Sequence, residues 1–239
     1  MNRLRALKTA LILTAENKPS VLFENETLNL LSDDISQPFN DKDSAYTSAW
    51  KSKNTFNKIL STLADSLSAR WYFVNSKKSM KEMVDDLKKP GIMMIYVPVK
   101  EEKRAKEKVE KDYGGSWSRI GDLLRASIVV DNFDELKQVI QLIFAAGLHL
   151  ARKPKDRFAN PVNKGYRDVL LNVILPNGHV AEIQLHLKPM FKAKEETYKF
   201  YKKIRENKNQ RQIDINQEKM KSLYDEAWQK IGEPAVLGR

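Results

Sequence analysis

The sequence predicts an α/β (α+β) protein in which helices flank one mixed β-sheet and helical extensions lie at both ends of the chain. Short apolar stretches typical of strands alternate with longer segments whose apolar residues recur every three or four positions, as in amphipathic helices. An Asn-Gly turn between the β-rich runs 169–175 and 180–185 predicts an antiparallel hairpin. Hydrophobic residues make up 41% of the 239 residues, which is enough for a core. Strands, helices and a hairpin in this order are typical of a mixed sheet.

The first 75 residues are predicted to be mostly helical. We expect an amphipathic helix at the very start, in preference to a signal peptide, because Lys8 interrupts the apolar stretch and no suitable cleavage site follows. Residues 32–41 have the composition of a loop. Ser44 is the expected N-cap of the next helix, whose apolar residues over 45–67 recur at spacings of three and four.

The remaining elements follow from the same patterns. The expected strands are 70–74, 92–97, 128–130, 169–175 and 180–185, and the expected helices are 79–88, 100–113, 134–146, 190–205 and 214–231. We therefore expect a central domain over residues 76–205, between an N-terminal region (1–75) and a C-terminal helical extension (206–239).

The charge balance and the missing residue types narrow the possible functions. Lysine and arginine (42) exceed aspartate and glutamate (31), for a net charge of +11, which suggests a polyanionic partner such as a nucleotide or RNA. Without cysteine there is no disulfide, thiolate zinc site or cysteine nucleophile, and three histidines are too few for a multi-histidine metal site. No apolar run approaches the roughly 20 residues of a membrane-spanning helix, so we expect a cytoplasmic protein without a membrane partner.

Two basic segments are candidates for binding phosphates. Lys100, Arg104 and Lys108 are four residues apart, so they stack on one helix face that could bind a polyphosphate. The nearby glutamates favour the simpler interpretation of a solvated helix with internal ion pairs. The segment 152–167 contains six basic residues and one acidic residue, with Phe158 and Tyr166 among them. This composition is typical of a loop that stacks on a base and binds phosphates, whereas a plain basic loop needs no aromatic residues.

Two carboxylates beside predicted strands, Asp122 and Glu182, form a candidate metal site. Magnesium is commonly bound through one or two carboxylates together with the phosphates of a substrate. The alternatives are that Glu182 faces solvent from its strand, where it alternates with apolar residues, and that Asp122 caps a turn.

Together these segments resemble the synthetase domain of the RelA/SpoT family, the ATP-dependent pyrophosphokinases with a nucleotidyltransferase-like fold, including its small alarmone synthetases. The resemblance covers about residues 95–205. The matching stretches are Lys100…Arg104…Lys108, Ile-Gly-Asp-Leu-Leu-Arg (120–125), Lys-Asp-Arg-Phe-Ala-Asn-Pro (155–161), Gly-Tyr-Arg (165–167) and Glu-Ile-Gln (182–184).

The resemblance implies a role for each matching residue. Asp122 and Glu182 would hold Mg²⁺, with Glu182 also near the attacking hydroxyl. The implied ATP-binding residues are Lys100, Arg104, Lys108 and Arg125, and the implied acceptor-binding residues are Lys155, Arg157, Tyr166, Arg167 and Gln184. Among these, Tyr166 would stack on the base of the acceptor.

The chain also departs from the family pattern, mainly on the acceptor side. Asp168 and Leu170 stand where the family usually has Ser and His, His186 stands for a customary Arg, and Tyr198 stands for a common His. No His-Asp metal-binding box precedes the synthetase part, so the hydrolase half of the long members is absent from this sequence.

The resemblance predicts an enzyme that transfers the β,γ-pyrophosphate of ATP to the 3′-hydroxyl of GDP or GTP, producing the alarmone (p)ppGpp of the stringent response. An adenine nucleotide and the 3′ end of tRNA are alternative acceptors, the latter in toxic members of the family, which would have a neutralising partner protein. A non-catalytic nucleotide- or RNA-binding domain is a further alternative. A non-catalytic domain is favoured by the altered residues Asp168 and Leu170 and by the basic segment 191–221. An enzyme is favoured by the presence of both acidic residues, Asp122 and Glu182.

Overall fold

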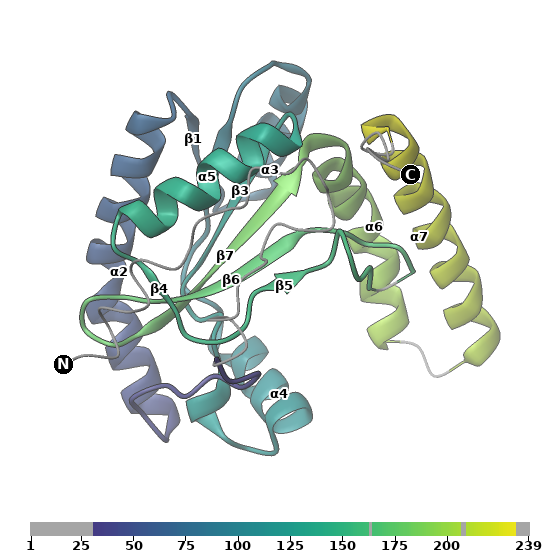
Figure 1. The fold of residues 1–239 in the computed structure, drawn as a ribbon. Helices are drawn as coiled ribbons and strands as arrows, with labels where there is room; N and C mark the ends of the chain where they lie inside the picture. The colour runs from purple at the N-terminus through teal and green to yellow at the C-terminus, as the bar shows by residue number, and fades with distance from the viewer. Residues whose placement is uncertain (1–30, 163, 207–208, 233–239) are drawn as a thin grey trace.

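The computed structural model describes residues 31–162, 164–206 and 209–232, and a seven-stranded mixed sheet forms its centre (Figure 1). The strand order is β1-β2-β3-β7-β6-β4, and β5 also pairs with β6. The strands are β1 (Arg70–Phe73), β2 (Met93–Tyr96), β3 (Arg125–Val130), β4 (His149–Leu150), β5 (Lys155–Asp156), β6 (Val169–Ile174) and β7 (Val180–Leu187). The pairs β1–β2 and β3–β7 are parallel and the others antiparallel, so the predicted mixed sheet is confirmed.

Every helix predicted after residue 40 is present, with its ends shifted by at most four residues. The helices are α2 (Lys42–Ser66), α3 (Lys77–Asp85), α4 (Glu102–Tyr113), α5 (Phe133–Ala145), α6 (Lys188–Glu206) and α7 (Gln210–Ile231). Asp41, not Ser44, caps α2, because its carboxylate accepts a hydrogen bond from the backbone N–H of Ser44 at 2.9 Å. The helix expected at the very start of the chain lies outside the described residues.

The sheet separates an apolar core from the face that carries the site. The core packs α2 and α5 against one face, with Phe56 and Ile140 meeting strand residues such as Ile183. The alternating residues of β7, among them Glu182 and His186, point to the other face, against which α3 and the start of α6 pack. In the predicted hairpin β6–β7, the polar residues on one face of β7 therefore lie inside the protein.

Elements from all three predicted regions pack against one another. α2 and β1, from the predicted N-terminal region, share the sheet and core with the central domain. α7 packs along α6 and against Tyr166, and Figure 1 shows the two helices side by side next to the sheet. Within the described ranges no helix is both long and apolar enough to cross a membrane.

Candidate active site

Two buried carboxylates lie side by side at the centre of the site face. Asp122 belongs to the loop before β3, and Glu182 lies on β7, directly beside Arg125 in the strand register. A backbone hydrogen bond from Glu182 N to Leu124 O, 2.9 Å long, holds this loop against β7. The two residues are only 6% and 7% exposed, so the alternative of a solvent-facing Glu182 does not hold.

The hydrogen bonds of the pair leave one carboxylate oxygen without a partner. Asp122 Oδ2 accepts from Lys100 Nζ at 2.7 Å and from Lys108 Nζ at 2.9 Å, whereas Asp122 Oδ1 is buried and unpaired. Burial raises the pKa of the Asp122 carboxyl, but attraction to the two lysines outweighs it and lowers the pKa to about 2. Burial and the charge of Asp122 raise the pKa of Glu182.

This arrangement fits the ligand requirements of Mg²⁺. A buried, unpaired oxygen beside a second carboxylate offers oxygen ligands of the kind that hard cations prefer, and a cation would relieve the repulsion between the two charges. Within the described part of the chain, no three His, Cys, Asp or Glu residues form a metal-binding group. Asp122 and Glu182 would together supply two ligands, which leaves room for the phosphates of a substrate.

The basic helix face predicted from the sequence is divided in the structure. Lys100 precedes α4, and the side chains of Lys100 and Lys108 are only 11% and 26% exposed and point to Asp122. Lys108 turns inward because it lies next to the buried Val109 on the core side of the helix. Arg104 is exposed, and its Nη2 lies 3.4 Å from the hydroxyl of Tyr198 on α6. The interpretation of a solvated helix face therefore applies to Arg104 alone.

Further cations surround the two carboxylates. Arg125 attracts Glu182 from β3, and the charge of Glu182 also acts on Arg152 and Lys155, whose pKa values burial lowers. Arg152 Nε donates to Asn172 Oδ1 on β6 at 2.7 Å. Together with the two lysines bound to Asp122, these cations outnumber the two carboxylates, and the surplus of positive charge suits a polyphosphate.

Close packing fixes the loop that carries Asp122. Asn172 Nδ2 donates to the carbonyl of Gly121 at 3.1 Å. A Cβ atom at Gly121 would lie 2.2 Å from Ile35 Cδ1 and 2.8 Å from Asn172 Nδ2. Only glycine fits at this position without displacing its neighbours, so Gly121 allows the close approach that places Asp122 next to Glu182.

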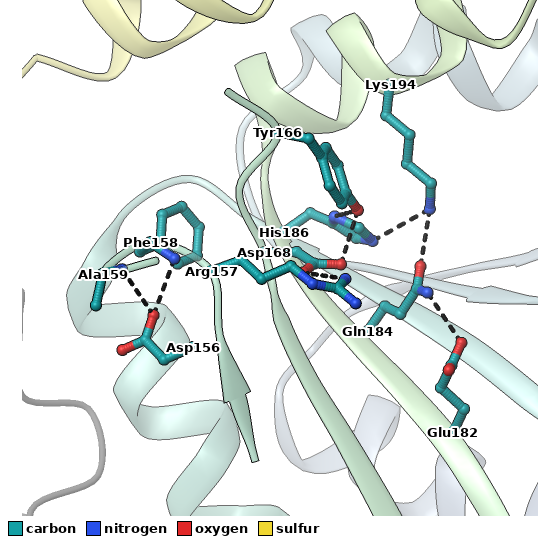
Figure 2. Close-up of polar contacts among 10 residues, drawn as sticks. All are labelled: Asp156, Arg157, Phe158, Ala159, Tyr166, Asp168, Glu182, Gln184, His186 and Lys194. Carbon is teal, nitrogen blue, oxygen red and sulfur yellow. Dashed lines mark hydrogen bonds and ion pairs between the residues drawn. The ribbon is translucent and has the colours of Figure 1, made fainter. Parts of the chain in front are cut away.

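Tyr166, the predicted base-stacking residue, is packed inside the structure. Its ring is only 7% exposed and packs against Tyr224 of α7, with 5.5 Å between the ring centroids. Its hydroxyl donates to Asp168 Oδ2 at 2.7 Å, and Arg157 Nη1 donates to Asp168 Oδ1 at 2.8 Å (Figure 2). In this conformation the ring offers no open face to a base, and Asp168 ties both side chains into the protein.

Arg167 and Phe158 also have structural partners. Arg167 Nη1 donates to the carbonyl of Phe158 at 2.7 Å, and its guanidinium lies 4.1 Å from the ring centroid of Trp228 on α7. The Phe158 ring is buried between Phe133 and Trp228. The aromatic and basic residues that suggested a base-stacking loop therefore dock α7, and the prediction of an acceptor contact by Arg167 does not match these contacts.

Two residues of the site were not selected from the sequence. Arg152 was part of the basic segment, and its distance of three residues from Lys155 is the signal that could have singled it out. Lys194 donates to the predicted site residue Gln184 at 2.9 Å. The sequence feature that could have identified Lys194 is its spacing on α6: it lies four residues after the buried Met190 and three before the buried Thr197, which places it on the inward face of the helix.

Comparisons with known proteins give the fold a precedent. Neither protein-family models nor curated proteins match the sequence. The small alarmone synthetase 1 from Bacillus subtilis bound to its product pppGpp matches with a TM-score of 0.53 at 16% identity, over 80% of this chain and 94% of that chain. The small alarmone synthetase 2 from Bacillus subtilis matches with a TM-score of 0.45 at 20% identity, over 75% and 92%. The Type VI effector Tas1, in a complex with its immunity protein, matches with a TM-score of 0.41 at 19% identity, over 73% and 96%.

The first of these likenesses confirms the fold that the sequence resemblance implied. The chain has the mixed-sheet α/β fold seen in a small alarmone synthetase, with a sheet of seven strands among the described residues.

Proposed function

We propose that this protein is a magnesium-dependent pyrophosphokinase that transfers the β,γ-pyrophosphate of ATP to the 3′-hydroxyl of GDP or GTP, with release of AMP. The observation that carries the proposal is the buried pair Asp122 and Glu182, with an unpaired oxygen and a surplus of surrounding cations. The fold supports it, because the structure of a protein with the same fold contains its product pppGpp.

Each group of side chains has a distinct task in this reaction. Asp122 and Glu182 would hold Mg²⁺, which when bound neutralises charge on the transferred phosphates. Lys100 and Lys108 keep Asp122 ionised and bind the donor phosphates from the side of α4. Arg125 lies on the same face of the sheet and adds a third cation for the donor, while the exposed Arg104 is proposed to reach ATP from the rim.

The acceptor side would use the cations that remain accessible. Lys155 is exposed, and the charge of Glu182 acts on both Lys155 and Arg152, so these two residues are the proposed contacts for the phosphates of the acceptor. Glu182 Oε1 accepts a hydrogen bond from Gln184, and its second oxygen is proposed to receive the proton of the attacking hydroxyl. Positioning and charge neutralisation, and not covalent catalysis, would then account for the rate.

A different acceptor is the second candidate, and the burial of Tyr166 favours it. If no base stacks on this ring, the guanine preference implied by the family resemblance loses its main contact. An adenine nucleotide or the 3′ end of tRNA would then be the acceptor.

The test is incubation of the purified protein with Mg²⁺ and ATP labelled in the γ-phosphate, together with GDP, GTP, ADP or bulk tRNA. We expect AMP release and label in the guanine nucleotide. Label in ADP or tRNA alone would replace the guanine acceptor by the second candidate. For a tRNA acceptor, log affinity should fall with log salt by about 0.7 per contacted phosphate. No AMP with any acceptor would leave the non-catalytic binding domain as the correct interpretation.

A further inference from the structure

A lysine that the proposed reaction does not use lies, partly buried, beside the carboxylate pair. Lys194 extends from α6 toward β7, where its Nζ donates to Gln184 Oε1 at 2.9 Å and lies 3.4 Å from His186 Nε2 (Figure 2). Burial lowers the pKa of Lys194, whereas the charges of Glu195, Asp168 and Glu182 raise it. A cation that is partly withdrawn from water is costly unless it is paired and hydrogen-bonded, so the position of Lys194 calls for a role.

Lys194 determines which way the Gln184 amide points. An ammonium group has only donors, so the atom of Gln184 that faces it must be the carbonyl oxygen. The amide NH₂ group is then directed at Glu182 Oε1, to which it donates at 2.9 Å. Without Lys194 the amide could rotate by half a turn and bring its oxygen against the carboxylate of Glu182.

The same reasoning determines the tautomer of His186. Its Nε2 faces the ammonium and must accept, so the proton of the neutral ring lies on Nδ1, 3.4 Å from the Tyr166 hydroxyl oxygen. Burial, together with the charges of Lys194 and Arg157, holds the pKa of His186 well below its usual range, which keeps the ring neutral. Tyr166 in turn donates to Asp168, the partner of Arg157.

The hydrogen bonds thus run outward from one cation to two carboxylates. One branch passes through Gln184 to Glu182 in the proposed metal site, and the other passes through His186 and Tyr166 to Asp168 beside the acceptor loop. Every donor and acceptor along both branches is consistent with a single set of proton positions.

We propose that Lys194 is a positioning residue that orients the Gln184 amide toward Glu182 and links the metal site to the Arg157–Asp168 pair of the acceptor loop. Its effect on catalysis rests on the proposed function. Its effect on hydrogen-bond direction does not, and it can be measured in the isolated protein.

The test compares Lys194→Met, which keeps the apolar stem and removes the donors, with Lys194→Arg, which keeps a cation without acceptors. Lys192→Met is the matched control, because Lys192 lies on the same helix with a side chain 61% exposed. In the wild type, ¹⁵N NMR of the His186 ring should show the Nδ1–H tautomer. Lys194→Met should mix the two tautomers, and Lys194→Arg and Lys192→Met should keep the wild-type pattern.

The kinetic arm measures the Mg²⁺ requirement. We expect Lys194→Met to lower kcat and raise the half-saturating Mg²⁺ concentration, each by about tenfold, which is the scale of one charge-assisted hydrogen bond. KM for ATP should change less than either quantity, and Lys194→Arg should restore most of the loss. A purely structural role would lower thermal stability without changing the Mg²⁺ requirement.

The two proposals fail in different ways. If the wild type transfers pyrophosphate but Lys194→Met keeps both the tautomer and the Mg²⁺ requirement, the positioning role is wrong and the proposed function stands. If the wild type transfers nothing, the proposed function fails. In that case an unchanged His186 tautomer in Lys194→Met would also overturn the positioning role of Lys194. A mixture of the two His186 tautomers in this variant would support that role.

Discussion

The proposed metal side of the site (Asp122, Glu182, Lys100 and Lys108) and its proposed acceptor side (the loop 152–167 with Asp168) use their charged residues in opposite ways. On the metal side, Lys100 and Lys108 share one oxygen of Asp122 and leave the other buried and unpaired. On the acceptor side, Arg157 and Tyr166 bind both oxygens of Asp168, which is fully buried. An unpaired group is available to a ligand, whereas a fully paired one stabilises the fold.

This difference shows why composition alone is a weak guide to a ligand site. The loop 152–167 is richer in cations and aromatic residues than the segment 120–125, yet its Phe158, Tyr166 and Arg167 are occupied by packing against α7. The segment with the less conspicuous composition, 120–125, provides the unpaired carboxylate oxygen.

The largest expected effect tests the structural character of the acceptor side. Arg157→Met leaves Asp168 buried without its cation, which should lower the free energy of unfolding by about 3–5 kcal/mol. Denaturant titration measures this loss. Adding Asp168→Asn should recover part of it, because no buried charge then remains.

Lys221→Met serves as the control for this prediction. It breaks an exposed pair with Asp225, in which both side chains are 50% exposed, and should cost only about 0–1 kcal/mol. Equal losses in the two single variants would contradict the distinction drawn between the buried and exposed pairs.

On the metal side we expect a loss of activity without a loss of stability. Glu182→Gln removes a charge proposed to hold Mg²⁺, so turnover should fall by about 100-fold or more, as when a group that stabilises transition-state charge is lost. Because it also removes repulsion from Asp122, the free energy of unfolding should not decrease. AMP release and denaturant titration measure the two quantities, and a folded variant with wild-type turnover would refute the metal assignment.

A smaller effect is expected from the loop that carries Asp122. Gly121→Ala places a Cβ atom against Ile35 and Asn172, and the resulting strain should cost about 1–3 kcal/mol of stability. Activity should fall as well, since Asp122 is the next residue. Ile35→Ala, introduced together with Gly121→Ala, removes the closest contact and should restore part of the stability; no restoration would mean that the clash with Asn172 dominates.

The last effect appears only at acid pH, at a buried group outside both sides. Burial lowers the pKa of His179 at the hairpin turn to about 4, so the unfolded chain takes up a proton before the folded protein does. The stability associated with neutral His179 is complete above pH 6.5 or so, and decreases by about 1.4 kcal/mol per pH unit as the pH falls toward 4.

His179→Gln isolates this contribution. The difference in unfolding free energy between wild type and variant should be constant above pH 7 and change steadily between pH 6 and 4. Asp156 and Glu195 are partly buried, and desolvation raises their pKa values, so they respond in the opposite sense but cancel in this difference. A difference that stays constant down to pH 4 would contradict the predicted shift.

Local patterns in the sequence were sufficient to predict the elements of the fold. The spacing of apolar residues predicted α2 to α7, and Asn177-Gly178 predicted the hairpin, because helix periodicity and turn conformation depend on neighbouring residues. The two-residue strands β4 and β5 were missed, since so short a strand leaves no periodic pattern. The carboxylates Asp122 and Glu182 could be selected because each stands beside a recognisable strand.

The tertiary structure alone decided which of the selected side chains are available to a ligand. Tyr166 became a packing residue because α7, about 58 residues further along the chain, covers its ring. Lys194 became part of the site because α6 places it over Gln184 of the neighbouring strand. Burial and hydrogen-bond partners arise from segments far apart in the sequence, and a residue's type and spacing therefore cannot show whether its polar atoms are already paired.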